Sequence, residues 1–225
     1  MNEFAASRTI GTTAIQQGAD PGALRQFLRA HTAEVHERLD ARFGDFAGPQ
    51  TVPSYQRFIR MNLLAHHGLA AFFEVVGVAE TVPDAAEATL IQSIESSLNH
   101  LEDDCAAMQL NCPPTRGFAL APCEISELAG LAYVLDGSRL GARFIYRRLE
   151  KSGLVGEDES EVSSRYLRST FEEKDRAPGA FDIISRMEDA VVEERALTAA
   201  LSTFTLFERS LDLVVAHEDG KEPVR

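Results

Sequence analysis

The sequence predicts an all-α protein built as one domain. Apolar residues recur at helical spacing in several long segments, and there is no long alternating run and no Asn-Gly hairpin. A length of 225 residues suits one large domain, and 44% hydrophobic residues suffice for a sizeable core. We therefore expect about six helices around one core, with no internal repeat.

The expected helices follow from the apolar periodicity and from residues that favour helix ends. The segments cover about residues 20–43, 53–77, 84–108, 124–151, 158–174 and 180–216. Asp20 followed by Pro21 is typical of a helix start, and Asp84 with Glu87 is typical of a capping box. We assign residues 20–217 to the domain, 1–19 to a flexible N-terminal arm and 218–225 to a flexible C-terminal tail.

The charge balance excludes some classes of protein. Acidic residues outnumber Lys and Arg by 35 to 22, which gives a formal net charge of −13. This surplus argues against a nucleic-acid-binding protein, because phosphate neutralisation needs basic residues. No apolar run approaches the ~20 residues of a membrane span, and no secretory signal pattern opens the chain. We expect a cytoplasmic protein that does not bind membranes and has reduced thiols at Cys105, Cys112 and Cys123.

Four residues share one side of the first expected helix: Arg29, Ala33, His36 and Asp40. At about 100° per residue, Arg29 and His36 point the same way and lie about 10 Å apart along the axis. The small Ala33 leaves space beside the imidazole. The pattern suits a flat iron-bearing ligand with carboxylates at one edge. A single helical histidine is also commonly a core or surface residue.

The remaining histidines and cysteines do not build a metal site. His31 is rotated about 140° from the face just described. We expect His66 in the core and His67 in solvent. No Glu lies three residues before any histidine, which disfavours a ferritin-like di-iron site, and the absence of CxxC disfavours a zinc site. Cys112-Pro113 is compatible with a heme-regulatory dipeptide, although such dipeptides also occur by chance.

A second pattern lies within residues 133–142, whose sequence is YVLDGSRLGA. Gly137 and Gly141 share a helix face, which Ser138 and Ala142 extend and Tyr133 borders. Glycine inside a helix costs about 1 kcal/mol relative to alanine, so we expect an interruption here. Two interpretations remain open: close packing of two helices, or a bent helix whose backbone approaches a planar ligand.

Taken together, three segments resemble the heme oxygenase family, especially its bacterial, bacteriophytochrome-associated branch. LRAHTAEVHERLD (28–40) resembles the family's proximal helix, AYVLDGSRLGARFI (132–145) its distal helix, and TAALSTFTLFERSL (198–211) its last core helix. The likeness extends over roughly residues 20–215, with the family's order and spacing kept.

The resemblance implies a role for each matching residue. His36 would be the neutral ligand of the heme iron, and Arg29 and Tyr133 would bind heme propionates. Gly137 and Gly141 would be the distal glycines, which act with Ser138 as the catalytic residues. The cofactor-binding residues implied are His36, Arg29, Ala33, Tyr133, Arg168 and Phe207.

Some assignments have an equally ordinary interpretation. Arg165 and Arg168 are weaker propionate candidates that can equally be surface charges. Phe204 and Phe207 line the heme pocket in one interpretation and belong to the plain core in the other. The arginines near the distal helix can form a docking patch for an acidic ferredoxin or can simply be solvated. These are Arg139, Arg143, Arg147 and Arg148.

The chain departs from the family pattern at two positions. Many members have Asp directly after the first distal glycine, where this chain has Ser138; Ser is usual in the bacterial branch. Asp136 is one position away and is expected to point elsewhere. The second distal glycine precedes Ala142 rather than Gly, which is expected to narrow the pocket slightly.

The implied activity is cleavage of heme by dioxygen, with electrons from ferredoxin or a reductase. The products are biliverdin, carbon monoxide and ferrous iron, and the biliverdin would supply a bacteriophytochrome. The absence of a distal His or Cys fits this activity, because a distal acid–base side chain favours peroxidase chemistry instead. The alternatives are a non-catalytic heme carrier or sensor on the same fold, and a helical interaction protein in which His36 is structural.

Overall fold

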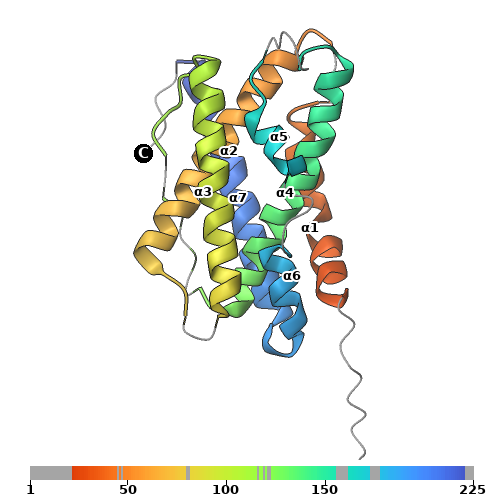
Figure 1. The fold of residues 1–225 in the computed structure, drawn as a ribbon, viewed down its shortest axis with the longest axis vertical. Helices are drawn as coiled ribbons and strands as arrows, with labels where there is room; N and C mark the ends of the chain where they lie inside the picture. The colour runs from red at the N-terminus through yellow and green to blue at the C-terminus, as the bar shows by residue number, and fades with distance from the viewer. Residues whose placement is uncertain are drawn as a thin grey trace, which may run out of the picture.

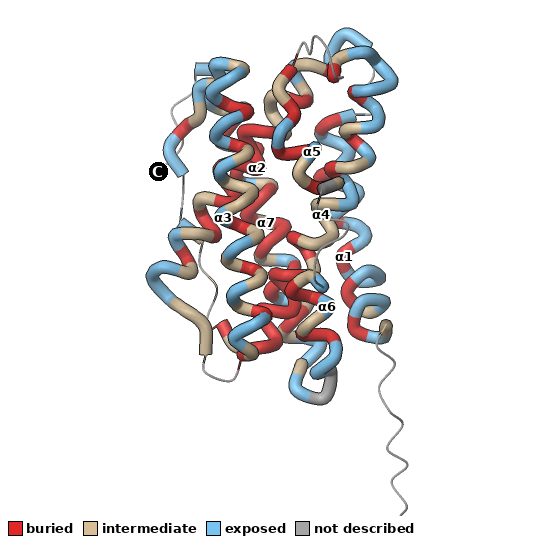
Figure 2. Tube along the Cα trace, viewed as in Figure 1, coloured by how far each residue is buried: buried red, intermediate tan, exposed pale blue. Residues whose placement is uncertain are grey.

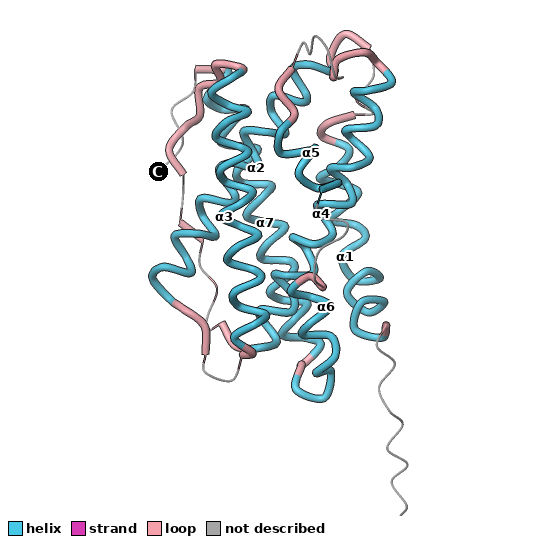
Figure 3. Tube along the Cα trace, in the orientation of Figure 1, coloured by secondary structure: helices cyan, strands magenta, loops and turns pink. Residues whose placement is uncertain are grey.

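A computed structural model describes residues 22–44, 46, 48–79, 82–115, 117–118, 120, 123–155, 162–172 and 178–220. Over these residues every regular element is a helix, and there is no strand (Figure 3). The predicted all-α class is therefore confirmed. The expected N-terminal arm, the helix start at Asp20-Pro21 and most of the expected C-terminal tail lie outside the described residues.

The described chain forms seven α-helices and one 3₁₀ helix (Figure 1). They are α1 (Ala23–Ala41), α2 (Thr51–Val76), α3 (Asp84–Ala107), α4 (Ile125–Lys151), α5 (Arg165–Glu172), α6 (Ala180–Ile184), η2 (Ser185–Ala190) and α7 (Glu193–Glu218).

The helix α7 lies in the middle of the bundle and packs against α4, α2 and α1. The helix α3 packs against α2 and lies in front of α7 in the view of Figure 1. Buried residues form stripes on the inner faces of these helices (Figure 2). Because α1 and α4 both rest on α7 and have few direct contacts with each other, space remains between them.

The predicted capping box at Asp84 and Glu87 is wrong. Pro83 is the residue before the helix, with extended φ −62° and ψ 128°, so Asp84 already belongs to the first turn. A capping box forms instead at the start of α4. There the Glu124 backbone N–H donates to the Glu127 carboxylate at 3.2 Å, and the Glu124 side chain accepts the Glu127 backbone N–H.

The predicted interruption of the fourth segment is also wrong, because α4 is continuous through Gly137 and Gly141. Its core side continues past both glycines with Ala142, Ile145 and Leu149, all buried. The packing of this stripe offsets the helix-breaking tendency of glycine.

The last expected helix is divided into three pieces. Met187 has non-helical φ −112° and ψ 36°, and the Val192 backbone N–H donates to the Ser126 hydroxyl at 2.9 Å. This long-range bond begins α7 at Glu193 rather than letting one helix run from Ala180.

The short helix α5 begins later than the sequence predicts, after the non-helical residues 162–164. Asp104 of α3 sets this start. Its carboxylate is fully buried and accepts the backbone N–H groups of Arg165 at 2.8 Å and Tyr166 at 3.0 Å, and the Ser163 hydroxyl at 2.6 Å. A residue distant in sequence therefore caps α5 and fixes it against the bundle.

Candidate functional site

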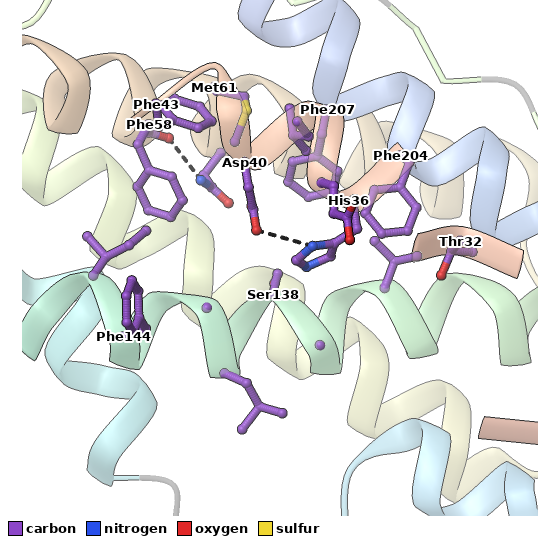
Figure 4. Close-up of a pocket in the computed structure, with 18 of the residues that line it drawn as sticks. Thr32, His36, Asp40, Phe43, Phe58, Met61, Ser138, Phe144, Phe204 and Phe207 are labelled. Carbon is purple, nitrogen blue, oxygen red and sulfur yellow. Dashed lines mark hydrogen bonds and ion pairs between the residues drawn. The ribbon is translucent and has the colours of Figure 1, made fainter. Parts of the chain in front are cut away.

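The space between α1 and α4 is a cavity of about 750 Å³ with walls from α1, α2, α4 and α7 (Figure 4). Sites for small molecules and cofactors measure about 300–1,000 Å³. Leu140 and Phe144 line it and are exposed, so the cavity opens to the surface along α4. Six phenylalanines contribute to its walls: Phe43, Phe46, Phe58, Phe144, Phe204 and Phe207.

His36 lies on the α1 wall, and its environment favours one ring nitrogen as a ligand. Its Nδ1 is 3.1 Å from the Asp40 carboxylate, one turn further along α1 (Figure 4). The ring also meets the edge of Phe204, with centroids 5.9 Å apart. The hydrogen bond to Asp40 raises the pKa of His36. Because Nδ1 is engaged, Nε2 is the nitrogen left for a ligand, which is the arrangement typical of metal-binding histidines.

The cationic end of the cavity lies about two turns from His36 on the same helix. Arg29 and Ala33 line the cavity together with His36, as the helical spacing predicts. Arg25 also lines it, but its guanidinium pairs with Asp182 at 2.8 Å. Arg29 is exposed and has no ion-pair partner within the described residues. It is therefore the cation available to an anionic ligand.

The α4 wall lies opposite and exposes backbone. Tyr133, Gly137, Ser138 and Gly141 all line the cavity. A Cβ added at Gly137 or Gly141 would have no heavy atom within 4 Å. These two glycines therefore do not mediate close helix–helix packing. That role belongs to Gly130, where an added Cβ would overlap the backbone of Ala196 in α7.

The polar groups of α4 near these glycines are held by the protein itself. The Ser138 hydroxyl donates to the Leu135 carbonyl at 2.8 Å. Asp136 accepts the Phe181 backbone N–H at 3.2 Å, and burial raises the pKa of its carboxyl. Asp136 thus points toward α6, as expected. Ala142 is fully buried and does not line the cavity, so the expected narrowing of the pocket by Ala142 is wrong.

Tyr133 lies at the cationic end, where α1 and α4 approach each other. Its hydroxyl is 3.5 Å from the Thr32 hydroxyl of α1, which itself donates to the Leu28 carbonyl at 2.8 Å. The Tyr133 ring packs edge-on against Phe181, with centroids 5.6 Å apart. These contacts fix the phenol beside the cavity.

A polar group on α2 escaped the sequence reasoning as a site residue. Asn62 lines the cavity; its side-chain amide donates to the Phe58 carbonyl at 2.8 Å and accepts the Tyr166 hydroxyl at 3.4 Å. Nδ1 of His66 bonds the Asn62 carbonyl at 2.8 Å. The sequence signal is an amide, one turn before His66, on the mostly apolar inner side of α2.

The buried groups behind Asn62 are neutral at physiological pH. Burial lowers the pKa of His66 to about 4 and raises the pKa of Tyr166 to about 12. The predicted core position of His66 is confirmed, and its lowered pKa keeps it neutral there. His67 is half-exposed beside Glu102, at 3.4 Å.

Several predicted candidates lie away from the cavity. Arg168 is exposed on α5 and does not line it, and Arg165 pairs with Asp103 at 2.6 Å. His31 is exposed and bonds the Phe27 carbonyl at 2.8 Å, on a different face from His36.

The four arginines of the expected docking patch are in two different environments. Arg143 donates to the Thr170 carbonyl of α5 and Arg139 to the Ser93 hydroxyl of α3. Arg147 and Arg148 are exposed. Two of the four arginines thus connect helices rather than form a docking surface.

Among the described residues that line the cavity, His36 is the single histidine. No group of three or more His, Cys, Asp or Glu side chains suited to a bare metal ion occurs among the described residues. In the same part of the chain, no helix is long and apolar enough to cross a membrane. Within the described part of the chain, the cavity thus combines one imidazole, the guanidinium of Arg29 and mostly apolar walls.

No protein-family model matches the chain, and no curated protein matches it in sequence. One solved structure that matches is the NO- and CO-bound heme oxygenase from Neisseria meningitidis, with a TM-score of 0.53 and 18% sequence identity. The match covers 90% of this chain and 94% of that one. The likeness extends over most of both chains, and it shows that this chain has the heme oxygenase fold.

Proposed function

We propose that the protein is a heme oxygenase that converts heme, dioxygen and externally supplied electrons to biliverdin, carbon monoxide and ferrous iron. One observation carries the proposal: His36 of α1 and the side-chain-free surface of Gly137 and Gly141 on α4 line the same cavity. An imidazole and a helix surface without side chains, both lining one largely apolar cavity, suit a planar ligand that is bound through its metal. The fold shared with a known heme oxygenase supports the same function.

His36 would hold heme through Nε2, while the Asp40 carboxylate fixes the ring through Nδ1. Heme, when bound, supplies the iron at which dioxygen is activated. The imidazole must be neutral to bind metal. The Asp40 hydrogen bond raises the pKa of His36, so a larger fraction of the imidazole is protonated at a given pH. This fraction has to release its proton when the metal binds.

The propionates would lie at the cationic end of the cavity. Arg29 supplies an unpaired guanidinium within the described structure, and the Tyr133 hydroxyl lies close by on α4. Arg–carboxylate contacts are short and directional, so they would orient the ring in its plane. This orientation matters in a chain of net charge −13, which otherwise repels an anionic ligand. Arg168 is not needed for this part of the proposal.

The α4 wall of the cavity would control the access of water and the delivery of protons. Without side chains, Gly137 and Gly141 let the α4 backbone approach the ligand closely. Oγ of Ser138 donates its proton to the Leu135 carbonyl and also contacts the Tyr166 side chain, which leaves one lone pair to accept a hydrogen bond from water. The phenylalanine walls exclude bulk water elsewhere. Ser138 with ordered water would then deliver protons in place of a carboxylate.

The proposed partners follow from the reaction. Electrons would come from a ferredoxin or a reductase, and the biliverdin would serve as the chromophore of a bacteriophytochrome. Co-expression with a phytochrome apoprotein tests the second point, because only a biliverdin-producing chain would yield the coloured photoreceptor.

A second candidate, a non-catalytic heme carrier, is favoured by one observation. The Ser138 hydroxyl is engaged by its own helix, and Asp136 points away, so this stretch of α4 offers no carboxylate to the cavity. Aerobic reduction of the hemin complex distinguishes the two functions. A heme oxygenase loses the heme absorption band and yields biliverdin and carbon monoxide, whereas a carrier keeps a stable ferrous spectrum.

The His36→Ala variant tests the ligand. Loss of the wild-type ferric spectrum with an unchanged helical circular dichroism spectrum supports the role of His36. A wild-type heme spectrum in this variant would remove His36 from that role. The variant His31→Ala is the matched control, because His31 lies on the same helix but faces away from the cavity.

A further inference from the structure

Two cysteines lie together at the end of α3. Cys105 belongs to its last turn and Cys112 to the irregular segment that follows, and their Sγ atoms are 3.9 Å apart. The chain reverses between them: Gln109 has φ 53°, and the Leu110 backbone N–H donates to the Cys105 carbonyl at 2.9 Å. Neither cysteine lines the cavity. The pair therefore has no part in the proposed heme site.

The surroundings make the two thiols unequal. Cys105 is buried, with 6% of its surface exposed, whereas Cys112 is partly exposed. A hydrogen bond joins the two thiols, and the nearby Arg60 guanidinium adds positive charge. Both effects lower the pKa of Cys112, while the same hydrogen bond and burial raise the pKa of Cys105. Cys112 is thus the more reactive thiol, because the thiolate is the reactive form.

We propose that Cys105 and Cys112 are a redox-sensitive dithiol that a peroxide oxidises to a disulfide. Hydrogen peroxide reacts with the Cys112 thiolate; the O–O bond breaks, sulfur gains OH as a sulfenic acid, and hydroxide leaves. The Cys105 thiol then attacks the Cys112 sulfur and displaces the OH, which leaves as water once it has taken the thiol proton. Two electrons pass from sulfur to peroxide. The irregular segment around Cys112 allows the sulfurs to approach the ~2.05 Å of a disulfide.

The third cysteine provides an internal contrast. Cys123 is buried, and burial raises the pKa of its thiol to about 12. Being a poor nucleophile with no cysteine beside it among the described residues, it is expected to stay reduced. The proposal therefore predicts that one defined pair out of three cysteines reacts.

The test uses the full chain, first reduced and then treated with a small excess of hydrogen peroxide. Titration of the free thiols in denaturant should give three per chain before the peroxide treatment and one after it. Cyanogen bromide cleaves after Met108 and trypsin after Arg116, so the fragments 62–108 and 109–116 separate unless Cys105 and Cys112 are joined. We expect mass spectrometry to find them joined, at two hydrogens less than the sum of their masses.

Three variants complete the test. Cys123→Ser should form the same linked fragments as the wild type. Cys112→Ser should form none, and Cys105→Ser should accumulate a Cys112 sulfenic acid that dimedone traps. If wild-type Cys112 is instead oxidised to sulfinic acid without a link, or if Cys123 reacts equally, the proposal is refuted. The wild-type fragment map decides the matter even if a variant fails to fold.

Discussion

Substituting alanine for the glycines of α4 separates their roles. At Gly137 and Gly141 an added Cβ has open space, and in the Gly130 position it overlaps the backbone of α7. Alanine in a helix interior is favoured over glycine by about 1 kcal/mol. We therefore expect Gly137→Ala and Gly141→Ala each to stabilise the ligand-free protein by about 1 kcal/mol, which raises Tm by about 2–4 °C at this size.

Gly130→Ala is the matched control on the same helix. There the propensity gain of about 1 kcal/mol is outweighed by overpacking, which costs about 1–3 kcal/mol and more when the neighbour is backbone. The Ala196 carbonyl cannot move without displacing α7, so we expect a net loss of about 2 kcal/mol or more. Urea unfolding of the ligand-free variants measures all three changes.

The effect on heme binding should have the opposite sign. In a site built to hold a flat ligand against bare backbone, a methyl group at position 137 or 141 occupies ligand space. At a hemin concentration of about 100 times Kd, the wild type gains about 2.7 kcal/mol, and a tenfold weaker variant gains about 1.4 kcal/mol. Should Gly137→Ala and Gly141→Ala both be destabilised without hemin, or both gain as much from hemin as the wild type, the assignment of these glycines to a ligand wall is wrong.

Three further predictions concern other parts of the structure. His66 has a pKa of about 4 when folded. Since the ordinary value is near 6.5, stability should fall as the pH drops from 6.5 towards 4, by about 2 kcal/mol at pH 5; urea unfolding of His66→Gln should show a shallower dependence on pH. Asp104→Ala removes the cap of α5 and should cost about 3 kcal/mol, measured by thermal unfolding, with Asp103→Ala nearly neutral as control. Asp40→Asn should weaken hemin binding about 10–100-fold at alkaline pH, where His36 is neutral in both proteins; an unchanged Kd would contradict the role of Asp40.

The α1 side of the site was predictable because its residues belong to one regular helix. Seven residues at about 100° each place Arg29 and His36 on one face, and no tertiary contact changes that relation. The shared face of Gly137 and Gly141 follows in the same way. The spacing alone does not decide whether that face meets another helix or open space. The answer depends on where α7 packs, which is against Gly130 and not against Gly137 or Gly141.

The features that the sequence did not predict depend on contacts between distant segments. Residues 180–216 contain no Gly or Pro, so the break before α7 has no local signal; it follows from the bond between Ser126 and the Val192 backbone. The start of α5 is set by Asp104, about 60 residues earlier in the chain. The contact of Asn62 with Tyr166 likewise joins α2 to α5.

The helix α4 combines two requirements that conflict in an ordinary helix. A wall that presents bare backbone to a ligand loses the side chains that would normally hold it in place. Here the first half of α4 is fixed by backbone contact with α7 at Gly130. The second half is tied by Arg139 to Ser93 of α3 and by Arg143 to the Thr170 carbonyl of α5. Because both arginines bond to helices other than α1, α4 is held in place without side chains on its glycine face.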